Sequence, residues 1–395
     1  MFPTLERGEL STRLERFRSL LTEHAVDGAL LVQKMDIYYL SGTDQDCHLW
    51  VPASNAPLLM VRKSIERAKE HSPLEAIVPL PSLSSIPEQI HEHSGSLPKR
   101  LGLEMDVLPA SLYLTYQRLF PGTEMLDISP LIRGLRMMKS LYEIGCLKKA
   151  AEMGDKMFGQ VPSFLEESRT ETDLALRLEA FYRKEGHPGL VRARTFNMEL
   201  FYGHVMSGKN AAMPSSSPGP TGGKGTGPFY SQGAGRDRIG PREPILVDLS
   251  SNVDGYVADQ ARIFSLGRLG DKFYQAHGVM LEVQEALCEK GSPGTMAGDL
   301  YNLAQEIVER AGLGDGFMGY PDPVPFVGHG VGLELDEWPI IGRNSETILQ
   351  EGMVIALEPK FIFPGEGVVG IENNLLVTGN GMKKLNRFPD EIFGC

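Results

Sequence analysis

The chain has 395 residues, which suits two or three domains and is long enough to bury a sizeable core. Its formal net charge of −12 argues against non-specific nucleic-acid binding, because phosphate contacts need clustered lysine and arginine. No apolar run approaches the roughly 20 residues that cross a bilayer, and the charged N-terminus lacks the apolar stretch of a secretory signal. These features, with four scattered cysteines expected as free thiols, predict a cytoplasmic protein that binds neither nucleic acid nor membrane.

The first third of the chain alternates between short helical and strand-like segments. Apolar residues recur at helical spacing from Glu9 to about Glu23, and the apolar strand ALLVQ follows. The apolar segments HLWVPA, APLLMVR and EAIVPL come next, separated by turn residues and by a helix-like stretch over residues 63–70. This order predicts a small α/β domain over residues 1–135.

The remaining residues, 136–395, combine longer helices with strand pairs. A glycine-, proline- and serine-rich segment, residues 214–235, predicts a long loop of the kind that usually serves a function. It is no phosphate-binding loop, because Lys224 is followed by Gly225 and the first glycine of that motif falls on Pro218, so we expect a pocket rim or a subunit contact. The amphipathic patterns predict helices at Ser140–Gly159, Thr170–Lys184, Asp271–Glu289 and Ala297–Ala311.

A first hairpin, EPILVDLSSNVDGYVADQARIF, presents two aspartates. Its turn signal is Asp254-Gly255. Cross-strand partners in a hairpin have a constant sum of residue numbers, and the turn allows sums of 507 or 509. Asp248 and Asp259 are then directly opposed or diagonal neighbours, and in both cases they share one face of the strand pair.

A second hairpin, MVIALEPKFIFPGEGVVGIENNLLVT, repeats the arrangement with two glutamates. A turn centred on Gly365 gives a sum of 730 and sets Glu358 opposite Glu372. Two acids on a solvated strand face would explain either hairpin alone. Buried like charges in two apolar strand pairs, however, require a counter-charge, which a pair of metal ions would supply.

His329 adds a nitrogen ligand to this set. It lies between Gly328 and Gly330 in FVGHGVGLELDEWP, and the glycines allow other groups to approach the backbone closely. Four carboxylates and one imidazole suit two divalent ions, with Mn²⁺ the first choice and Co²⁺, Zn²⁺ or Fe²⁺ as alternatives. Such a site activates water, so the pattern predicts hydrolysis.

The Asp–Asp–His–Glu–Glu order, with its GHG, EP and IEN contexts, resembles the M24 metallopeptidase family. Its members include methionine aminopeptidase, aminopeptidase P, prolidase and creatinase. The segment RLERFRSLLTEHAVDGALLVQKMDIYYLSGT resembles the N-terminal domain shared by the last three. The resemblance therefore implies an α/β creatinase-like N-terminal domain and an α+β catalytic domain of pita-bread fold over residues 136–395, and it makes methionine aminopeptidase a poorer match.

The resemblance also implies roles for individual residues. Asp248 would bind one ion, His329 and Glu358 the other, and Asp259 and Glu372 would bridge the two. Glu358 would also act as general base. Arg262, in DQAR, would pair with a ligand carboxylate, although Ala261 stands where the family usually has threonine.

Three positions on the substrate side depart from the family pattern. Ser215 and Asp336 stand where proline-specific members carry histidine, and Gly370 stands where arginine is expected. His204, in FYGHVMSG, is a candidate replacement for a lost histidine. Asp336 could face a cationic substrate group or be an exposed loop acid.

The leading functional prediction is hydrolysis of the bond preceding proline, in dipeptides or at peptide N-termini, by a homodimer. The alternatives are a non-peptidase hydrolase or lyase on the same scaffold, and an interaction module with weak or no catalysis. Because fold does not determine function, the site must decide among them.

Overall fold

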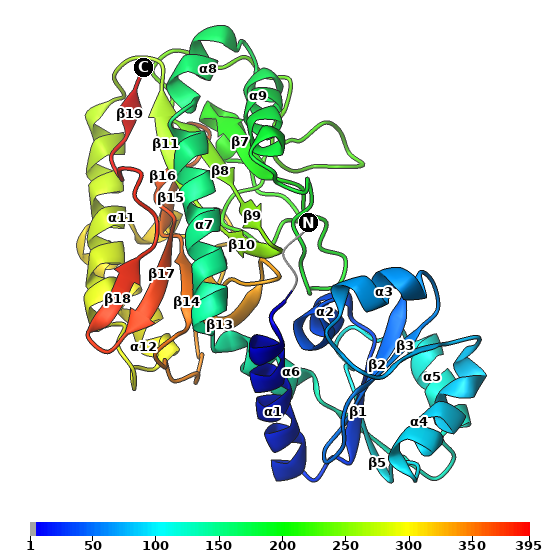
Figure 1. The fold of residues 1–395 in the computed structure, drawn as a ribbon. Coiled ribbons are helices and arrows are strands. Elements are labelled where there is room, and N and C mark those ends of the chain that lie inside the picture. The colour runs from blue at the N-terminus through cyan, green and yellow to red at the C-terminus, as the bar shows by residue number, and fades with distance from the viewer. Residues whose placement is uncertain (1–4) are drawn as a thin grey trace. The chain divides into compact units, whose positions relative to one another are not determined.

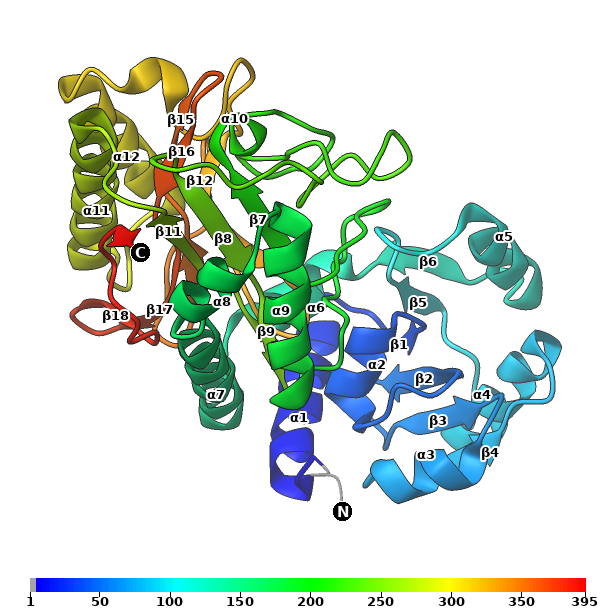
Figure 2. The same cartoon turned by 90° about the horizontal axis from the view of Figure 1, so that it is seen from above.

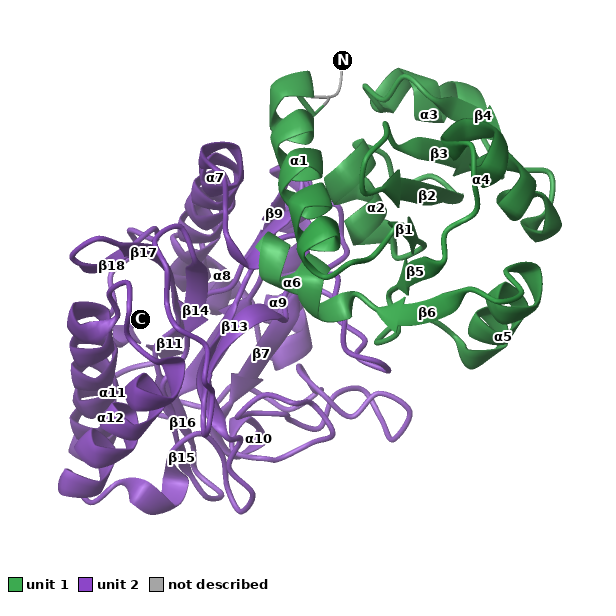
Figure 3. Cartoon of the chain, turned by 90° about the horizontal axis from the view of Figure 1, so that it is seen from below, with its two compact units in different colours: residues 1–136 green, residues 137–395 purple. Residues whose placement is uncertain are grey.

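The computed structural model describes residues 5–395, which divide into two compact units, unit 1 up to residue 136 and unit 2 from residue 137 onward (Figure 3). Each unit has its own hydrophobic core. Within the described residues, no helix is both long enough and apolar enough to span a membrane.

Unit 1 is a mixed sheet covered by helices on both faces (Figure 1). The strand order is β4-β3-β2-β1-β5-β6, with β1 antiparallel to β2 and parallel to β5. Its strands are β1 (Gly28–Leu31), β2 (Cys47–Pro52), β3 (Leu58–Val61), β4 (Ile77–Pro79), β5 (Arg100–Leu103) and β6 (Glu124–Asp127). Its helices are α1 (Arg7–Glu23), α2 (Lys34–Ser41), α3 (Ile65–His71), α4 (Ile86–Ser94), α5 (Ala110–Leu119) and α6 (Ser129–Met137), with a short 3₁₀ turn at Leu83–Ser85.

The core of unit 1 follows the apolar segments seen in the sequence. Leu30, Trp50 and Met60, from β1, β2 and β3, pack with Ile90 of α4 and Tyr116 of α5. The predicted α/β architecture of this part is confirmed.

Besides the two-stranded sheets β9–β10 and β15–β16, unit 2 has two larger sheets with helices packed against them. One sheet has the order β19-β11-β8-β7 and the other the order β13-β12-β14-β17-β18. Figures 1 and 2 show α11 and α12 side by side, and α11 contacts β15, β16 and β18. The helices are α7 (Leu141–Phe158), α8 (Val161–Glu167), α9 (Glu171–Lys184), α10 (Gly208–Ala211), α11 (Asp271–Lys290) and α12 (Ala297–Arg310), with a 3₁₀ turn at Gly314–Gly316.

The strands of unit 2 form hairpins and their extensions. They are β7 (Gly203–Ser207), β8 (Ile245–Leu249), β9 (Ser251–Val253), β10 (Tyr256–Ala258), β11 (Ala261–Ser265), β12 (Phe326–Gly330), β13 (Glu337–Gly342), β14 (Val354–Leu357), β15 (Lys360–Phe363), β16 (Gly367–Gly370), β17 (Asn373–Thr378), β18 (Gly381–Lys384) and β19 (Phe393–Gly394).

The four predicted helices of this region are confirmed as α7, α9, α11 and α12. Two of them begin with capping boxes, in which Ser140 and Thr170 each accept a hydrogen bond from the amide three residues later. Residues 214–235 contain no helix or strand, as their composition predicts.

Candidate active site

A pocket of about 250 Å³ in unit 2 gathers the five predicted metal ligands. Their placement depends on the two hairpins and on strand β12, and His204 of β7 lines the same pocket. Part of the wall is apolar and is formed by Val191, Met198, Leu200, Phe201, Leu335 and Ile340.

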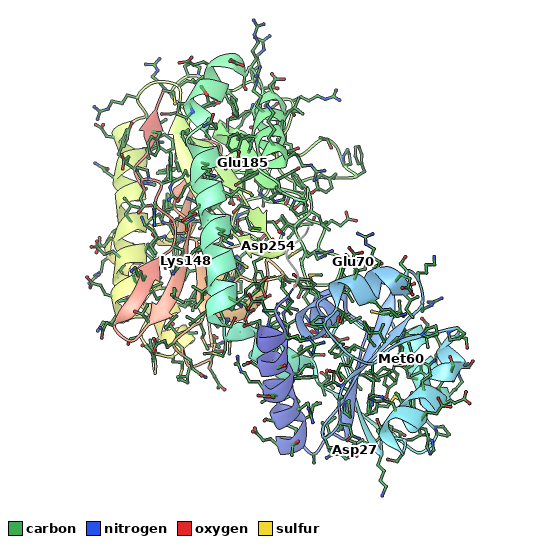
Figure 4. All side chains as sticks on the ribbon, in the orientation of Figure 1. Asp27, Met60, Glu70, Lys148, Glu185 and Asp254 are labelled. Atoms are coloured by element: carbon green, nitrogen blue, oxygen red, sulfur yellow. The ribbon has the colours of Figure 1, made fainter. Side chains whose placement is uncertain are left out.

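The first hairpin follows the register with the sum of 509. Asp254 and Gly255 both have positive φ, 54° and 88°, which is the backbone that a two-residue Asp-Gly turn adopts; Asp254 is labelled at this turn in Figure 4. Asp248 pairs with Ala261 across the strands. Asp259 is therefore the diagonal neighbour of Asp248, which confirms the second of the two predicted registers.

The second hairpin keeps the predicted sum of 730 along its whole length. Leu357 pairs with Asn373, and Lys360 pairs with Gly370 after a short interruption. Glu358 and Glu372 lie within that interruption, at matching positions. The hairpins are joined to each other because the backbones of Ala261 and Glu372 form an antiparallel bridge.

His329 lies on β12, between β13 and β14. The glycines on both sides are required by close backbone approach: a Cβ at Gly328 would lie 2.6 Å from the Ala356 oxygen, and a Cβ at Gly330 would collide with the Trp338 oxygen. Nδ1 of His329 lies 3.1 Å from the Gly330 oxygen. When Nδ1 donates to that oxygen, Nε2 is left with a lone pair, and it lies 3.7 Å from Oε1 of Glu358.

A residue that we did not predict, Lys360, lies among the ligands. Its Nζ lies 3.0 Å from Oδ2 of Asp248, 2.8 Å from Oε2 of Glu358 and 2.8 Å from Oε2 of Glu372. Strand alternation contains a signal for this, because residues 358 and 360 are two apart and face the same side. Three carboxylates around this ammonium hold its pKa well above the usual range, although burial alone would lower it.

The acids that face this pocket are difficult to ionise together. Burial, and then the Asp248 carboxylate, raises the pKa of Asp259 to about 6. Burial, and then the Asp259 carboxylate, raises the pKa of Glu372 well above its usual value. Oε1 of Glu372 is buried and accepts no hydrogen bond. A further cation at this point would favour the charged forms of both acids.

His204 lies directly opposite Asp248 in the β7–β8 pair. Burial lowers the pKa of its imidazole, so the neutral form is favoured at neutral pH. This places the candidate beside a predicted ligand, and its role in catalysis stays a prediction.

Asp336 lines the pocket, but its carboxylate is already engaged. It accepts hydrogen bonds from the amides of Arg194 and Thr195, at 2.7 and 2.8 Å, and from the Thr195 hydroxyl. Asp336 is therefore half-buried rather than the exposed loop acid considered from the sequence, and its hydrogen bonds fix the 194–195 segment at the pocket. A contact with substrate stays a prediction.

Ser215 is not among the residues that line the pocket, and its hydroxyl accepts a hydrogen bond from the Ser217 amide. The neighbouring residues 217–221 do line it. Of the two uses expected for the glycine-rich loop, a place at the pocket is therefore confirmed, although Ser215 itself does not line it, and a subunit contact stays a prediction.

Arg262 does not pair with a ligand carboxylate, so that expectation is wrong. The guanidinium instead donates to the backbone oxygen of Glu372 at 2.9 Å and forms an ion pair with Asp390 at 3.0 Å. Its support for the ligand is therefore through the Glu372 backbone. Burial lowers the pKa of Arg262 to about 10.

The donor atoms suit at least one divalent ion. Asp259, His329 and Glu372 each offer a ligand atom, and these atoms lie within 4.8 Å of one another. Two carboxylates and one imidazole are a donor set for Mn²⁺, Zn²⁺ or a similar ion. The Lys360 ammonium, by contrast, contacts oxygens of Asp248 and Glu358, which were predicted to serve two ions.

The sequence matches two families. Residues 145–379 match Metallopeptidase family M24, and residues 13–138 match the Creatinase/Prolidase N-terminal domain. The chain belongs to metallopeptidase family M24. It is therefore a hydrolase of the expected creatinase-like and pita-bread architecture, in a family that uses divalent metal ions.

Relatives match over nearly the whole chain. A Xaa-Pro dipeptidase of Pyrococcus furiosus is 28% identical over 385 residues, which are 97% of this chain and 100% of the relative. Among solved structures, a Xaa-Pro dipeptidase from Bacillus anthracis has a TM-score of 0.83 at 25% identity, covering 98% of this chain and 100% of that one. The prolidase from Pyrococcus furiosus has a TM-score of 0.76 at 28% identity, covering 94% and 99%.

Proposed function

We propose that this protein is a metal-dependent peptidase that cleaves the bond preceding proline, in dipeptides or at peptide N-termini. The observation that carries the proposal is the convergence of Asp248, Asp259, His329, Glu358 and Glu372 on one pocket with an apolar wall. Similarity to Xaa-Pro dipeptidases over 97% of the chain supports the substrate class, and apolar side chains at the wall suit a proline ring.

Different residues of the pocket would bind the metal ion, transfer the proton and contact the substrate. Asp259, His329 and Glu372 would hold a divalent ion, which when bound supplies Lewis acidity that activates water and polarises a peptide carbonyl. Glu358 would take a proton from the water and pass it to the leaving nitrogen. Neutral His204, opposite Asp248, would donate a hydrogen bond to the substrate.

The sequence-based expectations of Mn²⁺ as the preferred ion and of a cytoplasmic homodimer are also part of this proposal. The four cysteines are free thiols, which suits a reducing compartment. The dimer is supported by the family resemblance and is tested by sedimentation of the full chain.

The test is a hydrolysis assay with Ala-Pro, Ala-Pro-Ala and Ala-Ala, with Mn²⁺, Co²⁺ or Zn²⁺ added in turn to chelator-treated protein. We expect release of the residue before proline and little cleavage of Ala-Ala. Bound metal without cleavage of either proline peptide would instead indicate a different hydrolase or lyase reaction. A protein that binds no metal and cleaves no peptide would indicate an interaction module.

A further inference from the structure

We propose that this protein binds a single divalent ion, between Asp259, His329 and Glu372, and that the Lys360 ammonium takes the place of a second one. The proposal rests on the metal dependence of the proposed function but is independent of which peptide is cleaved. It also departs from the two ions predicted from the sequence.

Lys360 has the surroundings of a bound cation. Its side chain is 1% exposed, and Nζ lies 2.8–3.0 Å from one oxygen each of Asp248, Glu358 and Glu372. An ammonium group has three protons to donate, and three carboxylates accept them here. The same three oxygens are therefore engaged and are not free to bind a metal ion at that point.

The strand pair β15–β16 holds the lysine stem in place. Lys360 pairs with Gly370, and a Cβ at position 370 would lie 2.9 Å from Cγ of Lys360 and 2.7 Å from its Cα. The absence of a side chain at Gly370 is what leaves room for the stem. Moving the ammonium out would leave three buried carboxylates without their counter-charge, which is costly.

The cluster also holds donor atoms that Lys360 does not contact. Oε1 of Glu372 is buried and has no hydrogen-bond partner, while Oε2 of the same carboxylate contacts Lys360. Asp259 and His329 offer ligand atoms within 4.8 Å of Glu372. An unsatisfied buried carboxylate oxygen beside an imidazole and a second carboxylate is what a single bound cation would resolve.

The formal charges of the cluster also favour a single divalent ion. Four carboxylates and one ammonium leave three formal negative charges. One bound divalent ion changes the net charge of the cluster from −3 to −1. Two divalent ions would make the net charge positive and would lie close to the Lys360 ammonium. Neighbouring buried cations without enough opposing charge repel each other strongly.

The experiment compares metal stoichiometry in the wild-type protein with that in Lys360→Met, which keeps the length of the stem but removes the ammonium. Chelator-treated full-length protein is titrated with Mn²⁺, and bound metal is measured by calorimetry and by elemental analysis. Lys139→Met is the matched control, because Lys139 is also buried and paired, 2.7 Å from Glu337, but lies outside the ligand cluster. Circular dichroism checks that each variant folds, and Lys360→Ala replaces Lys360→Met if the latter does not.

We expect one equivalent of Mn²⁺ in the wild-type protein and in Lys139→Met, with the electron-paramagnetic-resonance signal of an isolated ion. In Lys360→Met we expect a second equivalent, bound at least about tenfold more tightly than any second ion in the wild-type protein, and an exchange-coupled signal. Two equivalents or none in the wild-type protein would overturn the proposal, as would one equivalent in both wild-type and Lys360→Met. Failure to cleave proline peptides would reject the proposed substrate and leave these counts unchanged.

Discussion

Each unit of this protein buries a cluster of charges, and the two clusters are balanced differently. In unit 1, Asp36 and Glu104 lie with Arg136, whose guanidinium is 2.7 Å from Asp36. Glu104 also accepts hydrogen bonds from the amides of Val32 and Gln33, at 2.7 and 3.0 Å. Here, a guanidinium and two backbone amides contact the two acids.

In unit 2, the four predicted acidic ligands line a pocket, and three of them contact the ammonium of Lys360. The first cluster is compensated by a guanidinium and backbone amides of the fold itself, although Oε1 of Glu104 has no hydrogen-bond partner, and it joins α2 and α6 to the residue that follows β5. The second keeps an excess of negative charge at a surface that a small molecule can reach. Buried charge alone does not identify a functional site. We infer that a functional site is indicated where the fold supplies too little opposite charge to balance the buried acids.

The largest expected effect is a loss of activity on substitution in the unit 2 cluster. Glu358→Gln removes the proposed general base but keeps the side-chain size, so kcat/KM for Ala-Pro should fall by about 10³-fold. The measurement is steady-state hydrolysis, with folding checked by circular dichroism. Near wild-type kcat in this variant would show that another group moves the proton.

In unit 1 the same kind of change should affect stability instead. Arg136→Met removes a buried guanidinium 2.7 Å from Asp36, and the free energy of unfolding should fall by about 3–5 kcal/mol. Urea denaturation measures this. Arg133→Met, on the same helix, removes a half-buried ion pair in which the atoms are 3.9 Å apart, and should cost about 1 kcal/mol or less. Equal losses in the two variants would contradict the distinction, as would a change in metal bound per folded chain.

The buried His48 of unit 1 predicts a pH dependence of stability. Burial lowers its pKa from 6.5 to about 4, and its Nε2 lies 2.7 Å from the Tyr116 hydroxyl. Between these pH values the unfolded chain binds a proton that the folded chain does not, so stability falls as the pH falls from 6.5 towards 4. The full loss is about 3 kcal/mol, and it is absent above pH 6.5.

The comparison of wild-type protein with His48→Gln isolates this effect from those of His187 and His277, whose pKa values burial also lowers. The difference in unfolding free energy between the two proteins should change between pH 6.5 and 4. A difference that does not vary with pH would show that His48 is not the group responsible.

The smallest expected effect concerns His204. Replacing it with alanine removes a proposed hydrogen bond to the substrate, and kcat should fall by about tenfold with KM little changed. His204→Asn keeps a donor and should recover part of the loss. Unchanged kcat and KM in His204→Ala would assign the histidine to packing alone.

Strand periodicity predicted much of this site. Alternation and constant cross-strand sums placed Asp248 with Asp259, and Glu358 with Glu372, because these rules depend only on local backbone geometry. The glycines beside His329 also predicted correctly that other groups approach the backbone closely there.

The contacts that escaped prediction join residues far apart in the chain. Arg262 pairs with Asp390, and Asp336 binds the amides of Arg194 and Thr195, across more than a hundred residues. No periodic pattern encodes such pairs, because tertiary packing decides which segments meet. Strand alternation places Lys360 on the same face as Glu358. It was nevertheless not predicted in the site, because a lysine beside a predicted metal ligand is unexpected.

The pairing of Lys360 with Gly370 restricts how this site can change in evolution. An arginine at position 370, where the family resemblance places one, would meet the lysine stem and, at 2.5 Å, the Pro359 oxygen. Gly370→Arg arising first would therefore be selected against in this background. Loss of the lysine side chain alone would leave the contacts with the Pro359 oxygen and the Lys360 Cα, so an exchange of one cation for the other also requires the two strands to shift at this point.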